Sequence, residues 1–479
     1  MRSTRTRFAP SPTGFLHVGG IRTALFAWLL ARQQGGQFIL RFEDTDKKRE
    51  VSGAREHLTR SLRTLGLDYD EGPDIGGPFA PYTQSERLEH YQQWAQKLIA
   101  AGRAYADPYS VEQVQAFRDQ AKTDKLPFLY RNHRPASPPE WNGTNPLRFK
   151  SDPKPYTWHD AVMGDLSTGP EVIDDFVLIK SDGYPTYNFA HIIDDLEMEI
   201  THVMRGQEFL ASTPNYLNLY EALEITAPIL ATMPHILAEN GNKKLSKRDD
   251  AKDVLDYIRD GYMPETLVNF IASLGWNDGS EQELFTVSEL IAKFSLDHVQ
   301  RSGARFDEKR LEWMNGSKIR GLSLDDLYER SQDFWPSSAT DYSVEYKQNV
   351  LELIQERLKY FAEIPQLTDF FFTDLPVALE LISGNKQLKK FTAIELANWL
   401  QISRDSIADS DFSATDLTER LNRLLEVTGQ KPGVLFSLIR VATTQSPASP
   451  ALAVTMALLT KDRCLSRLDQ QLVALHRTV

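Results

Sequence analysis

The sequence predicts an α/β domain with a parallel sheet in the N-terminal half, an inserted α+β domain, and an all-helical C-terminal half. Three observations predict this organisation. A helix pattern is followed by a strand pattern over residues 15–46, prolines cluster within residues 108–155, and apolar residues recur at helical spacing after about residue 250. With 479 residues, the chain is long enough for roughly three to five compact units.

The first elements are predicted from residues 19–44. After Gly19-Gly20, apolar residues recur at every third or fourth position over residues 21–29, which predicts a helix with one apolar face. Gly35-Gly36 is expected to end this helix. Residues 38–42 then form a strand candidate with Glu43 and Asp44 at its carboxyl end. In parallel α/β sheets, ligands bind beyond this end of the strands.

The later elements follow from the same patterns. Residues 84–102 predict a helix, the proline-rich region 108–155 predicts an inserted domain with short strands, and residues 176–180 resume strand character. Pro264 is expected to open a helix. Further apolar stripes predict core faces of helices at Leu351, Ile354, Leu358 and Phe361, and at Leu417, Leu421, Leu424 and Leu425; the basic pair Lys389-Lys390 is expected on a solvated face.

Composition and charge exclude several classes of protein. Hydrophobic residues make up 41% and charged residues 25% of the chain, as in soluble globular proteins. The single cysteine, Cys464, excludes a disulfide framework and any multi-cysteine zinc site. The basic N-terminus runs into no apolar segment and no stretch has the length of a membrane span, so we expect a cytoplasmic protein. The net charge of −12 argues against non-specific nucleic-acid binding but permits a specific RNA partner.

The segment His17-Val18-Gly19-Gly20 is the first candidate for chemistry. It precedes a predicted helix whose N-terminus offers unpaired N–H groups and the positive end of a dipole, which favour an anion. Glycines allow a nucleotide to approach the backbone closely, and a histidine can donate a hydrogen bond to a phosphate oxygen. Taken alone, the segment is better explained by a loop histidine that caps a helix.

The segment Lys244-Leu245-Ser246-Lys247-Arg248 is the second candidate, and it follows the turn-rich residues 240–242. Two lysines three residues apart could fold over a pyrophosphate leaving group, although a basic run is more usually a solvated loop. The chain contains neither a Walker motif nor a GxGxxG motif. Together and in this order, the two segments are interpreted as the two halves of a clamp for the triphosphate of ATP.

Four motifs together resemble a known family. They are RFAPSPTGFLHVGG from Arg7, RFEDTD from Arg41, YPTYNFAHIIDDLEMEITHVMRGQEFL from Tyr184, and KLSKR from Lys244. This ordered set is similar to the bacterial glutamyl-tRNA synthetases, which are class I aminoacyl-tRNA synthetases. The resemblance implies a Rossmann-like catalytic domain, an inserted acceptor-end-binding domain, an all-α stem-contact domain and two helical anticodon-binding domains. The expected boundaries are 1–82 with 185–240, then 83–184, 241–325, 326–385 and 386–479, respectively.

The resemblance implies ATP-dependent attachment of L-glutamate to tRNA(Glu) in two steps. Glutamate first attacks the α-phosphate of ATP, which enters with Mg²⁺, and the glutamyl group then passes to the 2′-hydroxyl of the terminal adenosine. Because no covalent enzyme intermediate is needed, positioning and charge stabilisation should carry catalysis. The residues implied as catalytic are His17, Lys244 and Lys247. The residues implied to bind ATP are Thr13, His17, Gly19, Gly206, Glu208, Lys244, Ser246 and Lys247.

Recognition of glutamate requires a partner for each end of the amino acid. The side-chain carboxylate is best matched by an arginine, and Arg205 occupies the family position for this role, with Arg7 and Tyr187 beside it. Glu43 and Ser11 are implied to receive the α-ammonium group. For Arg7 and Glu43 the alternative is a structural ion pair. Asp194-Asp195 is expected to organise the fold rather than to perform chemistry.

Some features depart from the family pattern. His191 and Phe209 stand where an asparagine and often a tryptophan are expected, so their own roles are open. Residues 105–109 contain no cysteine, so we expect no zinc and no other resident metal in the inserted domain. No arginine occurs between Arg357 and Arg404, where relatives specific for tRNA(Glu) read the anticodon; this predicts that tRNA(Gln) is charged as well.

Three alternatives compete with this interpretation. A paralogue that glutamylates a modified tRNA base would lack the helical C-terminal half, and a non-catalytic RNA-binding or regulatory protein on the same scaffold would have lost His17, Gly19, Lys244 or Lys247. A glutaminyl-tRNA synthetase is disfavoured by Arg205 and the helical C-terminal half. The family also implies a monomer.

Overall fold

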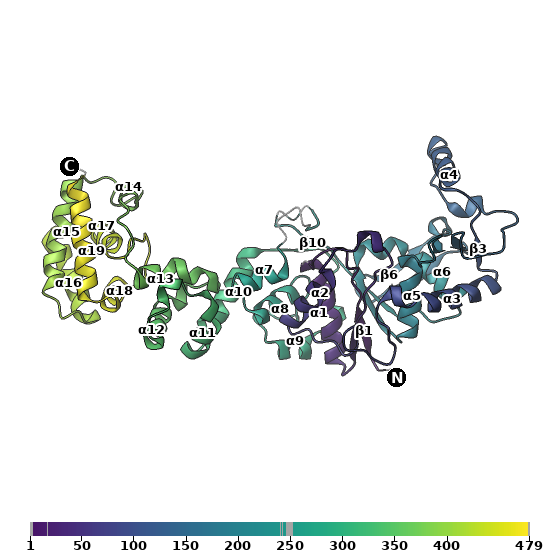
Figure 1. Ribbon diagram of the computed structural model, residues 1–479, viewed down its shortest axis with the longest axis horizontal. Helices are drawn as coiled ribbons and strands as arrows, with labels where there is room; N and C mark the ends of the chain where they lie inside the picture. Colours follow the sequence, from purple (N-terminus) through teal and green to yellow (C-terminus); the bar gives the residue numbers. More distant parts are fainter. Residues whose placement is uncertain (1–2, 17, 240, 242, 246–251, 478–479) are drawn as a thin grey trace. The chain divides into compact units, whose positions relative to one another are not determined.

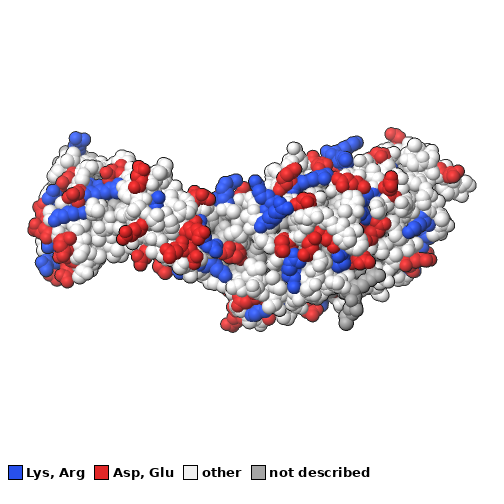
Figure 2. Space-filling model, turned by 60° about the horizontal axis from the view of Figure 1, so that its bottom comes forward, with Lys and Arg blue, Asp and Glu red and all other residues white. Residues whose placement is uncertain are grey.

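The computed structural model describes residues 3–16, 18–239, 241, 243–245 and 252–477, and divides the chain into two compact units. The first unit contains residues 1–258 and 264–311, and the second contains residues 259–263 and 312–479. Figure 1 shows the helices and strands of both units with their labels. On the face drawn in Figure 2, acidic and basic side chains are interspersed.

The strands all lie in the first unit. Their bounds are β1 Arg5–Phe8, β2 Gln37–Leu40, β3 Ala104–Ala106, β4 Leu147–Phe149, β5 Tyr156–Asp160, β6 Gly164–Thr168, β7 Val177–Ile179, β8 His202–Gly206, β9 Ile229–Met233, β10 Ile236–Leu237 and β11 Ala304–Arg305. β1 pairs with β2 in parallel, and β8 pairs with β9 in parallel. The N–H of Thr201, just before β8, donates to the carbonyl of Arg5 in β1 at 2.9 Å. The predicted parallel α/β arrangement is therefore confirmed.

The helices of the first unit pack around these strands. Their bounds are α1 Val18–Gln33, α2 Ala54–Thr64, α3 Leu88–Ala100, α4 Val111–Thr123, α5 Tyr187–Glu197, α6 Thr213–Ala222, α7 Val254–Arg259, α8 Pro264–Ala272, α9 Val287–Lys293 and α10 Glu308–Arg320, of which α10 continues into the second unit. The predicted starts at Gly19-Gly20 and Pro264 hold within a few residues.

Helix α1 differs from the prediction in one respect. It is buried on nearly all sides rather than on one face, since β1 and β2 cover one side and α8 and α9 cover another (Figure 1). The Phe26 ring packs against Phe294 at 5.3 Å between centroids. Gly35 ends the helix with φ of +61°, and a Cβ at Gly36 would lie 2.1 Å from the carbonyl oxygen of Thr4. The close turn into β2 therefore requires Gly36.

The region predicted as an inserted domain contains two sheets. β3, β4 and β7 form an antiparallel sheet, and α3 packs with α5 on the apolar core that includes Leu147 and Phe149. β5 and β6, at residues 156–168, instead join the four-stranded sheet of order β6-β5-β9-β8. The predicted segment 83–184 thus includes one strand, β5, that pairs with β9 of the predicted catalytic domain, and a second strand, β6, that extends this sheet through β5.

The second unit is helical in its described part. Its remaining helices are α11 Leu324–Arg330, α12 Val344–Ile354, α13 Ile364–Phe372, α14 Glu380–Ser383, α15 Ala393–Ala408, α16 Ala414–Thr428, α17 Pro432–Thr444, α18 Leu452–Leu459 and α19 Lys461–His476. The predicted stripe over 351–361 extends beyond α12, because Leu358 follows the 3-10 turn Gln355–Arg357 and Phe361 begins the 3-10 turn Phe361–Glu363. All four residues of the stripe are nevertheless buried in one core. Leu417, Leu421 and Leu424 are buried on α16 as expected, and Lys389-Lys390 is exposed.

Candidate active site

One cavity of the first unit, about 320 Å³ in volume, collects most of the predicted site residues. The carboxyl ends of the parallel strands β1, β2, β8 and β9 open onto it, together with the first turns of α1 and α5, as expected for a ligand site of a parallel sheet. The residues lining it include Arg7, Ser11, Gly19, Gly20, Arg22, Glu43, Tyr187, Arg205, Gly206, Glu208, Phe209, His235 and Lys244.

Four of the predicted site residues are not placed in this cavity. Thr13 is half-buried, its N–H donates to the carbonyl of Ser11 at 2.8 Å, and it does not line the cavity. His17, Ser246 and Lys247 lie outside the described residues. For those three the roles implied by the family resemblance stay predictions.

A buried ion network forms the wall of the cavity on the side of Arg7 and Glu43, which is the expected amino-acid end. Asp195, on α5, accepts from Arg7 Nε at 3.0 Å and from Arg41 Nη1 at 2.8 Å. Arg41, which is completely buried, also donates from Nη2 to Glu43 Oε1 at 2.9 Å. Burial alone would raise the pKa of the Asp195 carboxyl, but the guanidiniums of Arg7 and Arg41 hold that pKa well below its usual range. Asp195 therefore organises the site as a permanent anion.

Arg7 and Glu43 belong to this network, but they do not pair with each other. Arg7 is neutralised by Asp195 and also donates from Nη1 to the carbonyl of Met204 at 3.0 Å, while Glu43 pairs with Arg41. Burial raises the pKa of the Glu43 carboxyl to about 7, against the opposing influence of Arg41. Each of the two residues, taken singly, thus forms the structural ion pair that was the alternative for it, and both residues still line the cavity.

Arg205, on β8, is a buried arginine of the cavity wall that, like Arg22, has no carboxylate partner among the described residues. Its side chain is 7% exposed, its Nη2 donates to the hydroxyl of Thr213 at 3.3 Å, and its guanidinium lies over the Tyr216 ring at 4.8 Å. Among the described residues, no carboxylate lies within ion-pair distance of it. A buried cation without a counterion is costly, so this position favours a ligand that carries a carboxylate.

Two aromatic rings, Tyr187 and Phe209, line the cavity beside Arg205, and His191 packs behind Tyr187. The ring of Tyr187, at the first turn of α5, is tilted against Phe209 at 5.2 Å and against His191 at 4.8 Å between centroids. His191 is 1% exposed, and burial lowers its pKa to about 4, so it is neutral. Burial, followed by the charge of Glu43, raises the pKa of Tyr187 above its usual range, which keeps its hydroxyl protonated and able to donate.

The side of the cavity that carries Glu208 and Lys244, which is the expected nucleotide end, is more open to solvent. Lys244 Nζ lies 3.2 Å from Glu208 Oε1, and each side chain is about half-exposed. His235 Nδ1 lies 3.8 Å from the other oxygen of Glu208. Although burial acts in the opposite direction, backbone N–H groups and Lys244 lower the pKa of Glu208. A Cβ at Gly206 would lie 2.3 Å from Glu208 Oε2, so glycine leaves room for this carboxylate.

Sequence reasoning missed Arg22 as a residue of the cavity. It is 4% exposed on the first turn of α1 and donates to the carbonyls of Leu274, at 3.2 Å, and Pro234. Burial lowers its pKa to about 10, and Glu208 acts against this shift. The sequence did contain a signal for it, because Arg22 is a charged residue within the apolar spacing of residues 21–29. Asp194-Asp195 was expected to organise the fold, but the network that Asp195 forms with Arg7 and Arg41 was not predicted, because these partners are far apart in sequence.

The described residues match neither the pattern of a metal cluster nor that of a membrane span. No group of three or more His, Cys, Asp and Glu side chains within the described ranges is placed to hold a metal ion. No helix built from the described residues is long and apolar enough to cross a bilayer. The expectation of no zinc in the inserted domain stays a prediction.

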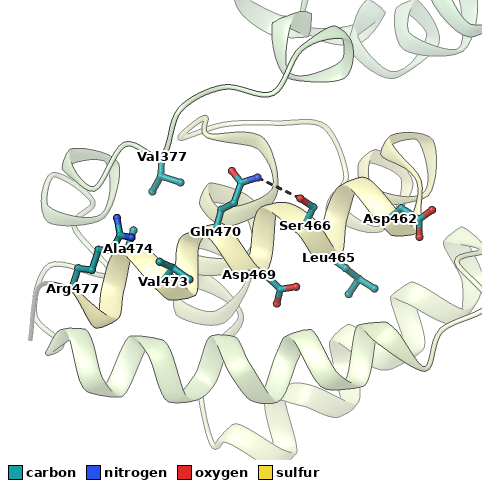
Figure 3. Close-up of a pocket in the computed structure, with 9 residues that line it drawn as sticks. All are labelled: Val377, Asp462, Leu465, Ser466, Asp469, Gln470, Val473, Ala474 and Arg477. Carbon is teal, nitrogen blue, oxygen red and sulfur yellow. Dashed lines mark hydrogen bonds between the residues drawn. The ribbon is translucent and has the colours of Figure 1, made fainter.

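A larger open groove, about 770 Å³, lies on the second unit (Figure 3). It follows one face of α19, and Val377 lies opposite that helix. Its carboxylates are Asp462 and Asp469, of which Asp469 already pairs with Arg404 at 2.8 Å. We place the candidate active site in the first unit, because the groove brings together none of the paired cations and glycines that a nucleotide requires.

Comparison with known proteins identifies the family. Residues 3–313 match the catalytic domain of the class I tRNA synthetases for E and Q, and residues 326–472 match an anticodon binding domain. Glutamate–tRNA ligases from Dehalococcoides mccartyi and Chloroflexus aurantiacus are 40% and 39% identical, and each alignment covers at least 97% of both chains. A crystal structure of a glutamate tRNA ligase from Elizabethkingia meningosepticum, in complex with its amino acid, superposes with a TM-score of 0.87 at 31% identity, covering 99% of this chain and 100% of that one. The chain therefore belongs to the class I glutamate–tRNA ligases.

Proposed function

We propose that this chain attaches L-glutamate to tRNA(Glu) at the expense of ATP. The observation that carries the proposal is a single cavity with two different ends. Arg205 is buried at one end without a carboxylate partner among the described residues, and Lys244 stands with Gly19 and Gly206 at the other. This arrangement suits an acidic amino acid whose own α-carboxylate points toward a bound triphosphate.

In the first step, the α-carboxylate of glutamate attacks the α-phosphorus of ATP, and pyrophosphate leaves with its magnesium ion. Arg205 would hold the side-chain carboxylate through its planar guanidinium, assisted by Arg7 and Tyr187. Glu43 and Ser11 would receive the α-ammonium group. Lys244 would stabilise the negative charge that develops on the leaving phosphates, together with His17 and Lys247.

In the second step, the 2′-hydroxyl of the terminal adenosine attacks the carbonyl carbon of the adenylate, and AMP leaves. The inserted domain is proposed to hold the acceptor end of the tRNA, and the helical domains at 326–385 and 386–479 its anticodon. The match of residues 326–472 to an anticodon binding domain supports the second assignment. We propose further that the enzyme acts as a monomer and in the cytoplasm.

ATP–pyrophosphate exchange, measured with each amino acid and with or without tRNA, tests this function. We expect exchange with glutamate only, dependent on tRNA. A protein that binds tRNA without any exchange would be a non-catalytic RNA-binding protein.

The role of Lys247 is tested by Lys247→Ala, which should slow exchange and leave tRNA affinity nearly unchanged. Weaker tRNA binding with normal exchange would assign this lysine to the RNA instead.

The range of tRNA substrates needs a separate measurement. The absence of an arginine between Arg357 and Arg404 supports charging of tRNA(Gln) in addition to tRNA(Glu). Glutamylation of purified tRNA(Gln) is the direct test. No detectable charging beside full charging of tRNA(Glu) would restrict the enzyme to tRNA(Glu).

A further inference from the structure

His57, on α2, contacts one described residue near in sequence to each of the two segments interpreted as the clamp for ATP. Its Nε2 lies 2.8 Å from Oδ2 of Asp253, and the two side chains are 11% and 17% exposed. On the other side, the Phe15 ring stacks on the imidazole at 4.6 Å between centroids and 30° between planes. Phe15 precedes His17 by two residues, and Asp253 follows Arg248 by five.

Each contacted residue is itself fixed to its own segment. Asp253 precedes α7, and its Oδ1 accepts from the N–H of Leu255 at 2.8 Å, so it caps that helix. The loop before Phe15 is tied to the start of α2, because the N–H of Val51 donates to the carbonyl of Pro12 at 2.9 Å. A displacement of α2 or of His57 would therefore reach both segments.

Simple packing does not account for an imidazole at this position. Nδ1 of His57 is buried and has no hydrogen-bond partner among the described residues, which costs free energy that an apolar side chain would avoid. Half of the Phe15 surface is exposed, so burial alone gives this ring little reason to lie on α2. The contacts with Asp253 and Phe15 are what the imidazole provides in return for this cost. A histidine here is therefore explained if both partners have to be held in place.

We propose that His57 is a positioning residue that couples the segment carrying His17 to the segment that follows Lys244–Arg248, so that both approach ATP in register. The proposal rests on the proposed function. It predicts that loss of His57 affects ATP activation and spares glutamate binding, because Arg205 and Glu43 are held by the separate network around Asp195.

The test is a double-mutant cycle in tRNA-dependent pyrophosphate exchange, with His57→Ala, Asp253→Asn and the combination. Asparagine can still accept from the N–H of Leu255, so Asp253→Asn keeps the cap of α7 and is informative even where His57→Ala folds poorly. We expect each single change to lower kcat/KM for ATP by about tenfold, with KM for glutamate unchanged, and the combination to be no worse than either.

A matched control is the pair His159–Asp165, which has the same chemistry at 2.7 Å on the exposed turn region of β5 and β6. His159→Ala should change no kinetic parameter. The coupling would be overturned if the effects of His57→Ala and Asp253→Asn multiply in the combination, or if they fall equally on ATP and glutamate. It would also be overturned if both variants have the same kinetics as His159→Ala. Absence of exchange in the unmodified protein would instead refute the proposed function.

Discussion

The two ends of the candidate active site are built in different ways. At the amino-acid end, Arg7, Arg41, Glu43 and Asp195 are at most 5% exposed and satisfy one another before any ligand arrives. At the nucleotide end, Lys244 and Glu208 meet in a half-exposed pair that water screens. On the proposed function, the difference implies that selection of the amino acid depends on a preorganised interior, whereas activation depends on side chains that a ligand can easily recruit.

The largest expected effect comes from removing the centre of the buried network. Asp195→Ala leaves the guanidiniums of Arg7 and Arg41 without their shared counterion, and we expect a loss of about 3–5 kcal/mol in the free energy of unfolding. Urea denaturation measures it. Asp165→Ala, which removes an exposed carboxylate, is the control and should have no effect on stability. A loss below about 1 kcal/mol would show that Asp195 does not organise this end.

Arg205 sharpens the comparison, because it is buried but has no carboxylate partner among the described residues. Arg205→Ala should lower kcat/KM for glutamate roughly a hundredfold, since the ligand carboxylate loses its counterion, and leave KM for ATP nearly unchanged. Unlike Asp195→Ala, it should not destabilise the fold. Steady-state kinetics and thermal denaturation of one preparation give both results. An unchanged KM for glutamate would refute the assigned role.

The pH dependence of glutamate binding probes Glu43. Because its pKa is raised to about 7, this carboxyl is mostly neutral at pH 6 and mostly charged at pH 8. The α-ammonium group needs the charged form, so kcat/KM for glutamate should rise about tenfold over this range. Glu43→Gln, which keeps the shape without the charge, should show a lower and flat profile. A rise that persists in Glu43→Gln would assign the titration to another group.

The smallest effect on stability is expected at the nucleotide end. Lys244→Ala removes a half-exposed ion pair, and the free energy of unfolding should change by no more than about 0.5 kcal/mol. Pyrophosphate exchange should nevertheless slow markedly, since the lysine is proposed to face the leaving phosphates. A stability loss comparable with that of Asp195→Ala would remove the distinction between the two ends.

The sequence motifs predicted which residues gather at the site better than how they pair. Arg7, Glu43, Tyr187 and Arg205 were expected together and do line one cavity. That Asp195 would neutralise Arg7 and Arg41 was not predictable, because the partners are 188 and 154 residues apart and spacing does not reveal which charges meet.

The same limit applies to the fold. Helix α1 and its end were predicted from residues 19–36, because apolar spacing and helix-ending glycines are features of the local sequence. Its burial on nearly all sides could not be predicted, because α8 and α9 come more than two hundred residues later. Leu358 and Phe361 kept the apolar spacing of a helix but lie beyond the end of α12, where the tertiary core sets their position.

Calorimetric titration with a non-hydrolysable glutamyl-adenylate analogue tests the central claim most directly, because one ligand has to reach both ends of the cavity. We expect Arg205→Ala and Lys244→Ala each to weaken its binding, by amounts that add in the double variant, since the two residues hold different parts of the same molecule. Binding that depends on one of these residues and ignores the other would contradict the claim that both face one ligand.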